Sequence, residues 1–389
     1  MFSSVNEPCS AWHAFKQATW IYVVWRLSLM LFCFVLLTAS GERPNNRHKT
    51  RDAFPNNNFL TSWVRWDSNW YHDIATKGYY KRRGQSNVTF FPAYPYMSRW
   101  LGGLTGSVFS AGLILSHLAT WLGLFLMFRL GTLFFSESVT KLSLILILVF
   151  PGSFFFSAFY TESLFFFLAA ASLFYFLRQS FFLAGLFGCF AQLSRPVGLL
   201  LFATYGLVLL VELIKDRRSF RLSWLWTLLI PAGLGGFSLL LHYKVGDALA
   251  WKSSQQAWGG QPTFPLWTPF RYLFYKIDYS FPRGWNKEGN IHHFLNALYS
   301  LAAIAGCAWM IIKRYHAALW LFVASGLAVT LYVGHLMSFN RHVIVLFPLF
   351  YLLADVVSRY KNLERWTIYT FSFFLSFYLL RYLNWYWAG

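Results

Sequence analysis

The residue that stands out for its chemistry is Asp67, because it lies in a stretch from Trp63 to Lys77 that is rich in tryptophan and tyrosine. If this stretch is one helix at about 100° per residue, its aromatic residues share one face. The residues on that face are Trp63, Trp66, Trp70, Tyr71 and Ile74. Asp67 falls on the same face, where a carboxylate among indole rings is costly unless it has a partner or a task. We therefore predict that Asp67 is the reactive group, the alternative being an interfacial carboxylate paired with Arg65 or Lys77.

Two neighbours of Asp67 on the same stretch are expected to play other roles. Asp73 lies at the border of the aromatic face, which favours a solvated or structural partner. His72 lies on the face opposite Trp63 and is expected to point to solvent.

Cationic side chains follow two apolar runs, as Ser194-Arg195-Pro196 and as Asn340-Arg341-His342. An arginine near the end of a membrane helix is costly unless it faces a polar cavity or an anion. A planar guanidinium is well suited to hold a phosphate or pyrophosphate. Arg195, Arg341 and His342 are therefore candidate phosphate ligands, and snorkelling to lipid headgroups is the alternative.

Two further motifs carry candidate polar contacts. Glu162, after Tyr160-Thr161, either stabilises a helix start or contacts substrate directly or through another residue. In Gly246–Gly259, Trp251 and Trp258 are spaced for one helical face, either as an interfacial anchor or as a surface for a sugar ring.

The composition points to a membrane protein. Of 389 residues, 57% are hydrophobic and 22% aromatic, and the mean hydropathy is +0.43. Repeated apolar runs of helical length predict an all-α polytopic helical bundle of about eleven spans. The expected spans are 19–39, 107–128, 142–159, 163–177, 181–193, 197–214, 224–241, 294–312, 317–337, 343–357 and 366–385.

The net charge of +19 fits membrane topology better than nucleic-acid binding. With the N-terminus in the cytoplasm, most Lys and Arg residues of the short connections fall on the cytoplasmic side. Two long loops, 40–106 and 243–293, then face outside, so that the candidate residues converge on one extracytoplasmic site in a single domain, 1–389. The four cysteines lie at unrelated spacings and suggest neither disulfides nor a metal site.

Several short motifs, in order along the chain, resemble the PIG-V type mannosyltransferases, a family that includes the enzyme adding the second mannose of GPI anchors and shorter bacterial relatives. The matching segments are 65–71 with 78–79, 91–95, 160–163, 194–198, 246–250 with Trp258, and 339–341 with 347–348. The chain is shorter than the eukaryotic members and has Ser194-Arg195-Pro196 where they tend to carry Asn-Gly. These departures favour a prokaryotic relative and argue against a GPI acceptor.

The resemblance implies a GT-C type integral membrane glycosyltransferase with amphipathic interfacial helices in its first outer loop. Its donor would be a polyprenyl-phosphate sugar, most often mannose, and Asp67 would be the general base of an inverting transfer at the outer face of a bacterial inner membrane. The acceptor would be a glycan, a glycolipid or a protein. No essential metal or other cofactor is expected, because a lipid phosphate leaves with its own charge.

The remaining candidates are substrate-binding or supporting residues: Trp66, Trp70, Tyr71, Asp73, Tyr94, Tyr160, Glu162, Asp247, Trp258 and Asn340. A flippase or transporter for lipid-linked sugars, without glycosyl transfer, is the alternative function. A catalytically silent scaffold within a glycosylation complex is a third.

Overall fold

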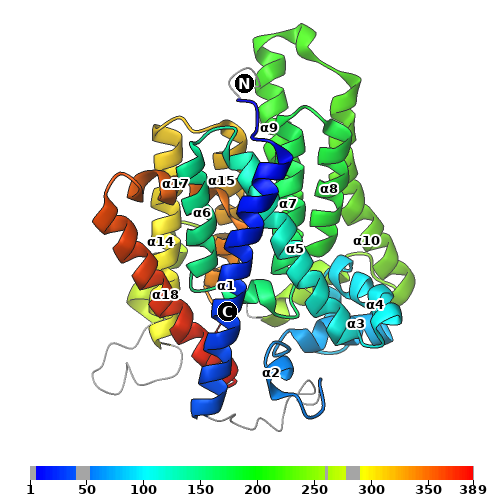
Figure 1. Ribbon diagram of the computed structural model, residues 1–389. Coiled ribbons are helices and arrows are strands. Elements are labelled where there is room, and N and C mark those ends of the chain that lie inside the picture. The colour runs from blue at the N-terminus through cyan, green and yellow to red at the C-terminus, as the bar shows by residue number, and fades with distance from the viewer. Residues whose placement is uncertain (1–5, 41–52, 259–261, 277–289, 389) are drawn as a thin grey trace.

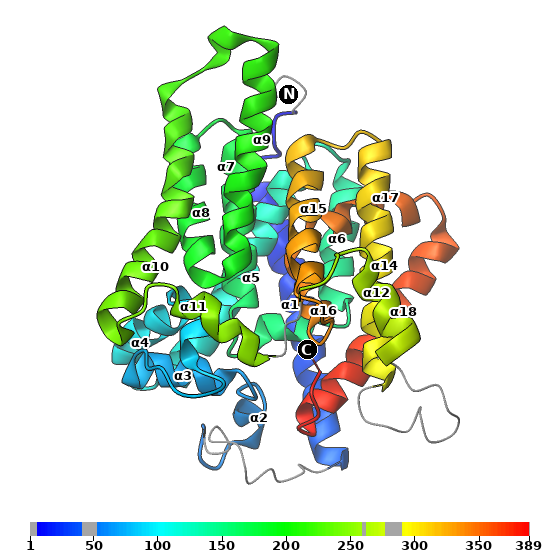
Figure 2. The same ribbon diagram turned by 180° about the vertical axis from the view of Figure 1, so that it is seen from behind.

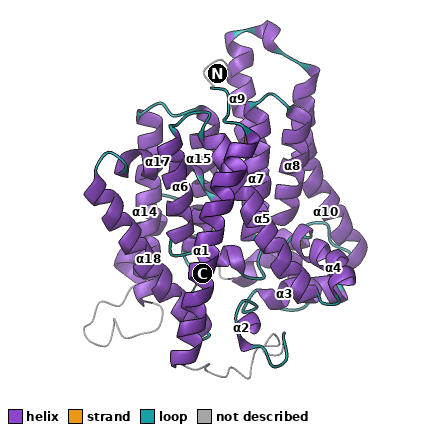
Figure 3. Ribbon diagram, viewed as in Figure 1, coloured by secondary structure: helices purple, strands orange, loops and turns teal. Residues whose placement is uncertain are grey.

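The computed structural model describes residues 6–40, 53–258, 262–276 and 290–388. Helices joined by loops make up the described chain, with 78% helix and no strand in these ranges (Figure 3). The predicted all-α class is therefore confirmed.

The α-helices are α1 (Ala11–Ser40), α2 (Asn58–Thr61), α3 (Ser68–Lys77), α4 (Ala93–Thr105), α5 (Val108–Gly131), α6 (Glu137–Val149), α7 (Glu162–Leu177), α8 (Phe181–Ser194), α9 (Leu199–Lys215), α10 (Leu229–Val245), α11 (Ala250–Ser253), α12 (Trp267–Arg271), α14 (Asn290–Ile312), α15 (Ala317–Tyr332), α16 (Phe339–Val345), α17 (Pro348–Val357) and α18 (Lys361–Leu383). Short 3-10 segments are η2 (Asn87–Thr89), η3 (Ser153–Ser157), η4 (Pro196–Gly198), η5 (Arg217–Ser219), η6 (Leu222–Leu228) and η7 (Ser254–Trp258), and the π-helical turn η8 (Tyr272–Lys276) follows α12.

Among the described residues, five helical stretches are long and apolar enough to cross a membrane: 11–39, 108–131, 196–215, 222–245 and 290–312. A bent pair, α16 with α17, makes a sixth if it is one span. The segments expected to span as α7, α8 and α15 are apolar but have only 16, 14 and 16 residues. At about 1.5 Å per residue they fall short of a hydrocarbon core of about 30 Å. The fold is thus an apolar helical bundle with five or six helices able to span.

The bundle has two unlike ends. The chain starts at one end, where α9 ends at Lys215, α14 ends at Ile312 and α15 begins (Figure 1). The short elements α2, α3 and α4 gather at the opposite end, and α11 lies there too (Figure 2). The two loops expected on one side therefore do bring their described helices to one end of the bundle.

Helix α4 exposes a row of apolar side chains at that end. Met97, Trp100 and Leu104 are spaced along one face and are 37%, 73% and 78% exposed. A short helix with this apolar face is typical of an element that lies in a membrane interface.

The bent pair α16–α17 turns by 85° between Val345 and Pro348. Proline suits the first turn of α17, since its missing N–H would have no intrahelical partner there. A broken helix is tolerated at membrane depth where protein surrounds it. Helix α16 meets this condition, because it packs against α7, α14 and η3.

The expected single helix over 63–77 is wrong in its first part. Helix α3 begins only at Ser68, and Trp66 adopts a left-handed φ of +54°. The residues before Ser68 form a turn held by the distant segment 159–160, which helical periodicity cannot reveal. His72 is not directed to solvent but stacks on Phe109 at 4.3 Å between ring centres.

Candidate active site

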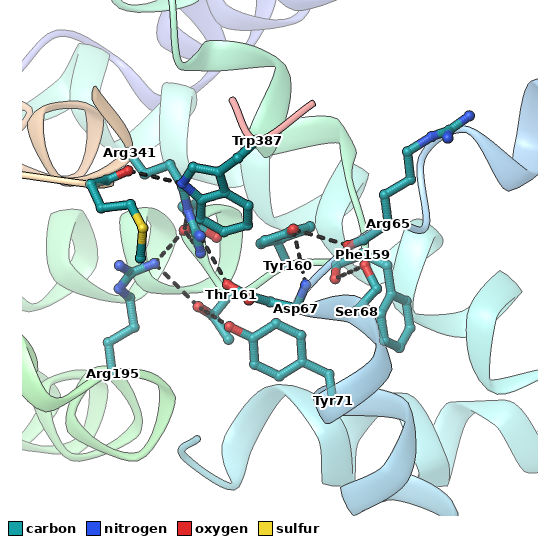
Figure 4. A network of polar contacts seen from close by, with 12 residues as sticks. Arg65, Asp67, Ser68, Tyr71, Phe159, Tyr160, Thr161, Arg195, Arg341 and Trp387 are labelled. Atoms are coloured by element: carbon teal, nitrogen blue, oxygen red, sulfur yellow. Dashed lines mark hydrogen bonds and ion pairs between the residues drawn. The ribbon is translucent and has the colours of Figure 1, made fainter. Parts of the chain in front are cut away.

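Asp67 lies immediately before α3, and its carboxylate is directed toward Arg341 (Figure 4). Arg341 Nη1 donates to Asp67 Oδ2 at 2.9 Å, and the Asp67 side chain keeps 16% of its surface exposed. The expected alternative partners lie elsewhere: Lys77 pairs with Asp73, and the Arg65 guanidinium lies 4.2 Å from the ring centre of Trp385. Asp67 is thus held by a cation from a helix 274 residues further along the chain.

Tyr160 fixes the turn that presents Asp67. Its hydroxyl accepts from the Asp67 backbone N–H at 3.3 Å and donates to the Arg65 carbonyl at 3.0 Å. Phe159 adds two bonds to the same turn, donating to the Trp63 carbonyl at 2.9 Å and accepting from the Ser68 hydroxyl at 3.1 Å. These bonds explain why the backbone tolerates the left-handed Trp66, since such a conformation persists only where its surroundings determine it.

Arg341 connects the partly exposed Asp67 with the buried Glu162. Its Nε and Nη2 both lie 2.7 Å from Glu162 Oε1, while Nη1 binds Asp67. Its Cζ also lies 4.8 Å from the ring centre of Phe155 and 4.7 Å from that of Tyr160. All three guanidinium nitrogens are therefore used in positioning carboxylates.

Arg195 approaches Glu162 from the other side. Its Nη1 lies 2.6 Å from Glu162 Oε1 and donates to Thr161 Oγ1 at 3.3 Å. The chain leaves α8 at Arg195 and folds back at once through η4. A Cβ at Gly198 would lie 2.4 Å from the Gln192 nitrogen, so this close return requires glycine. The Arg195 side chain keeps 11% of its surface exposed.

The network thus holds two carboxylates and two guanidinium groups, and we call Asp67, Glu162, Arg195 and Arg341 the charged network. Glu162 is fully buried, and its Oε2 has no hydrogen-bond partner among the described residues. Burying paired ions costs several kcal/mol per ion in desolvation, which their attraction offsets only with good geometry. Snorkelling to lipid is therefore not what Arg195 and Arg341 do, and Glu162 does more than stabilise the start of α7.

Burial raises the pKa of Asp67 above its usual range, and the nearby Arg341 opposes but does not reverse this rise. Glu162 adds to the rise as a second negative charge. Burial also raises the pKa of Tyr71, whose hydroxyl lies 3.4 Å from Thr161 Oγ1 at the edge of the network. A carboxylate with a raised pKa is a stronger base once it is ionised.

The segment 384–388, which follows α18, lies beside the charged network and was not foreseen from the sequence. Trp387 Nε1 donates to the Met337 carbonyl at 2.9 Å, and the Ala388 carbonyl accepts from Asn340 Nδ2 at 2.7 Å. Trp66 packs edge-on against Trp385 and Trp387, at 6.1 and 5.5 Å between ring centres. The Trp-Tyr-Trp sequence at 385–387 was a possible signal, but it directly follows an apolar run and resembles an interfacial anchor.

Two acids among the sequence candidates lie outside the charged network. Asp73 accepts from Lys77 Nζ and from the Tyr80 hydroxyl, both at 2.9 Å. Asp247 pairs with Lys81 at 2.8 Å, which lowers its pKa. In the described part of the chain, neither acid contacts an arginine of the charged network: Asp73 is held from within α3 and the residues just after it, and Asp247 is held by the loop residue Lys81.

Several other candidates have supporting positions. Asn340 is buried and also accepts from the Arg341 backbone N–H at 2.9 Å. Tyr94 donates to the Gly112 carbonyl at 2.8 Å. Trp70 stacks on Phe90, with ring centres 5.8 Å apart.

His342 does not join the charged network through any hydrogen bond found in the described residues. It lines a small apolar cavity with Phe165, Thr330 and Leu346. The side chain of Trp258 lies outside the described part of the chain, so that candidate has no structural outcome.

Within the described ranges, no group of three or more His, Cys, Asp and Glu residues is placed to hold a metal ion.

A comparison with protein-family models finds no model that matches this chain, and a comparison with curated proteins finds no match either. The resemblance to the PIG-V type mannosyltransferases is therefore carried by the short sequence motifs alone.

Proposed function

We propose that this protein transfers a sugar, with mannose as the first choice, from a polyprenyl-phosphate donor to an acceptor hydroxyl. The observation that carries the proposal is the charged network, in which Asp67 is the partly exposed acid and Glu162 the fully buried one. A partly exposed base beside cations is what transfer from an anionic leaving group requires.

In the proposed reaction, Asp67 is the base and the lipid phosphate is the leaving group. Asp67 Oδ1 or Oδ2 takes the proton of the acceptor hydroxyl while the hydroxyl oxygen forms a bond to the anomeric carbon. The bond from that carbon to the phosphate oxygen breaks, and its electron pair leaves with the lipid phosphate. Attack opposite the leaving group inverts the configuration at the anomeric carbon.

The two arginines have different roles in this proposal. Arg341 binds both acids and so orients the base. Arg195 binds Glu162 through Nη1, and its partly exposed side chain is the better candidate to stabilise the departing phosphate. His342, expected as a third phosphate ligand, lines a separate apolar cavity and has no part in the proposed step.

The proposal includes the GT-C type architecture with about eleven spans and a site at the outer face of a bacterial inner membrane. The basic connections after α9 and α14 lie at the end of the bundle where the chain starts, which supports a cytoplasmic N-terminus under the positive-inside rule (Figure 1). The charged network and α4 then belong to the outer end.

The test uses purified protein in proteoliposomes with radiolabelled polyprenyl-phosphate mannose and extracted membrane glycolipids as acceptors. We expect labelled product from the wild type and a loss of about 100-fold or more in Asp67→Asn, because removing a general base has effects of that order. Asp73→Asn is the matched control and is expected to retain activity within about twofold, because Asp73 binds Lys77 and Tyr80 and lies outside the charged network. Full turnover by Asp67→Asn contradicts the role of Asp67.

The same vesicles distinguish the alternative function. A flippase needs a polar path that opens to both faces, whereas the charged network found in the described residues lies at one end of the bundle. Movement of the labelled lipid across the membrane without any glycosidic product would favour the transporter over the enzyme.

A further inference from the structure

Three tryptophans pack together beside Asp67, and the transfer reaction alone does not require them. Trp66 directly precedes Asp67. Trp385 and Trp387, from the segment 384–388, pack against the Trp66 ring. We call these three residues the tryptophan wall. Trp387 and Trp66 are half-buried, whereas Trp385 is 6% exposed.

Two members of the tryptophan wall have strained backbones. Trp66 has φ of +54° and Trp385 has φ of +62°, and these are two of only five non-glycine residues with positive φ in the described chain. A bulky residue in this region costs of order 1 kcal/mol or more and often marks a functional site. The two strained residues contact each other through their rings.

The wall is also fixed by polar contacts that lead to the charged network. Trp387 donates through Nε1 to the Met337 carbonyl, and Arg381 donates to the Trp387 carbonyl at 3.2 Å. Asn340 binds the Ala388 carbonyl, and the next residue is Arg341. The Arg341 Cζ lies 5.8 Å from the Trp387 ring centre, so a group that reaches Asp67 lies close to this indole (Figure 4).

We propose that the hydroxyl deprotonated by Asp67 belongs to a sugar ring, and that the tryptophan wall holds this ring, with Trp387 as the contacting residue. The acceptor is then a glycan or glycolipid rather than a protein side chain. An indole beside a carboxylate suits a sugar, because its face packs against ring C–H groups while the carboxylate accepts from a hydroxyl. This inference rests on the proposed glycosyl transfer and narrows its acceptor.

The test compares Trp387→Phe with Trp387→Leu in the transfer assay described above. Both variants lose the indole N–H bond to Met337, but only phenylalanine keeps an aromatic face. We expect Trp387→Leu to raise the KM for a glycolipid acceptor about fivefold or more, and Trp387→Phe to stay within about twofold of the wild type. The KM for the lipid-phosphate donor is expected to stay unchanged in both.

Trp366→Leu is the control, because Trp366 is 68% exposed and lies near the start of α18, far along that helix from the wall. If Trp387→Leu does not fold, Trp66→Phe and Trp66→Leu make a second pair with the same expected order. Equal kinetics in the Phe and Leu variants overturn the proposal, whether both match the wild type or both are equally impaired. Transfer by the wild type to a threonine peptide in preference to a glycolipid overturns it too.

A binding experiment separates this inference from the proposed function. Saturation-transfer NMR with methyl α-mannopyranoside, on protein in detergent, reports contact with a sugar ring without any turnover. A signal that is retained in Asp67→Asn and Trp387→Phe but falls in Trp387→Leu supports the wall, even if the wild type transfers no sugar. If the wild type transfers sugar but the NMR signal is the same in Trp387→Phe and Trp387→Leu, the proposed function stands and the tryptophan wall is not the sugar-binding site.

Discussion

Asp67 and Asp73 are six residues apart, yet the structure gives them different kinds of partner. Asp67 shares Arg341 with the fully buried Glu162, so each ion is held by partners from distant helices. Asp73 is buried too, but it accepts from Lys77, four residues along the same helix, and from the nearby Tyr80 hydroxyl. The comparison teaches that the partners of a carboxylate, and neither its burial nor its place in an aromatic stretch, separate a residue of the charged network from one held by its own helix.

The largest effect is expected at Glu162, because both arginines depend on it. Glu162→Gln leaves two buried guanidinium groups with one fewer negative charge, and breaking a buried pair in this way costs about 3–5 kcal/mol. Thermal unfolding in detergent measures the loss, with Asp73→Asn as the matched carboxylate-to-amide control. A Glu162→Gln protein as stable as that control would contradict the expectation that the ion pairs of Glu162 stabilise the folded protein.

A smaller effect is expected at Gly152, which lies against the helix carrying Arg341. A Cβ there would lie 2.7 Å from the Asn340 carbonyl oxygen, so Gly152→Ala must displace α16 or the chain before η3. Such overpacking typically costs about 1–3 kcal/mol. We expect Gly152→Ala to lose both stability and transfer activity, whereas Gly103→Ala, which has open space around it, serves as the control. Unchanged transfer by Gly152→Ala would argue that α16 need not be held in place.

The pH dependence of transfer offers a third test. Since burial raises the pKa of Asp67, the base is ionised only above that raised pKa, and the rate falls as pH decreases through it. The acid limb of the pH profile should therefore lie above the ordinary aspartate value of about 3.9. In Arg341→Gln the opposing positive charge is lost, so the acid limb should move to still higher pH. A limb that moves to lower pH in that variant would contradict the assigned pairing.

The smallest effect is expected at the pair of Asp73 with Lys77. Lys77→Ala removes one partner of Asp73, and since Lys77 is 60% exposed, a helix pair of this kind contributes about 0.5 kcal/mol or less. Its unfolding temperature and transfer activity should stay close to those of the wild type. If Lys77→Ala lost as much stability as Glu162→Gln, the contrast between the Asp73 pair and the charged network would be contradicted.

The sequence allowed much of the charged network to be predicted, because residue type and topology carry that information. Asp67, Glu162, Arg195 and Arg341 come from four separate motifs, and each was expected at the same end of the bundle. Their mutual contacts could not be predicted, since these depend on how α7, α8 and α16 pack. The shared use of Glu162 by both arginines is a product of that packing.

Other features could not be predicted from sequence periodicity or hydropathy. The helix start at Ser68 depends on the Tyr160 hydroxyl, 93 residues from its partner Asp67. The break between α16 and α17 interrupts a continuous apolar run, so hydropathy does not reveal it. Pro348 is the one sequence signal at that place. The tryptophan wall depends on a segment that hydropathy assigns to the end of a span.

The separation of 274 residues between Asp67 and Arg341 has a consequence for biogenesis. When the ribosome has delivered α3 and α7, both acids are in place, but the helix with their shared cation has not yet been made. The network can close only after α16 has entered the bundle, and contacts of such long range form late in folding. A chain that stalls before this step presents two carboxylates without their shared cation, a difference that membrane quality control could recognise.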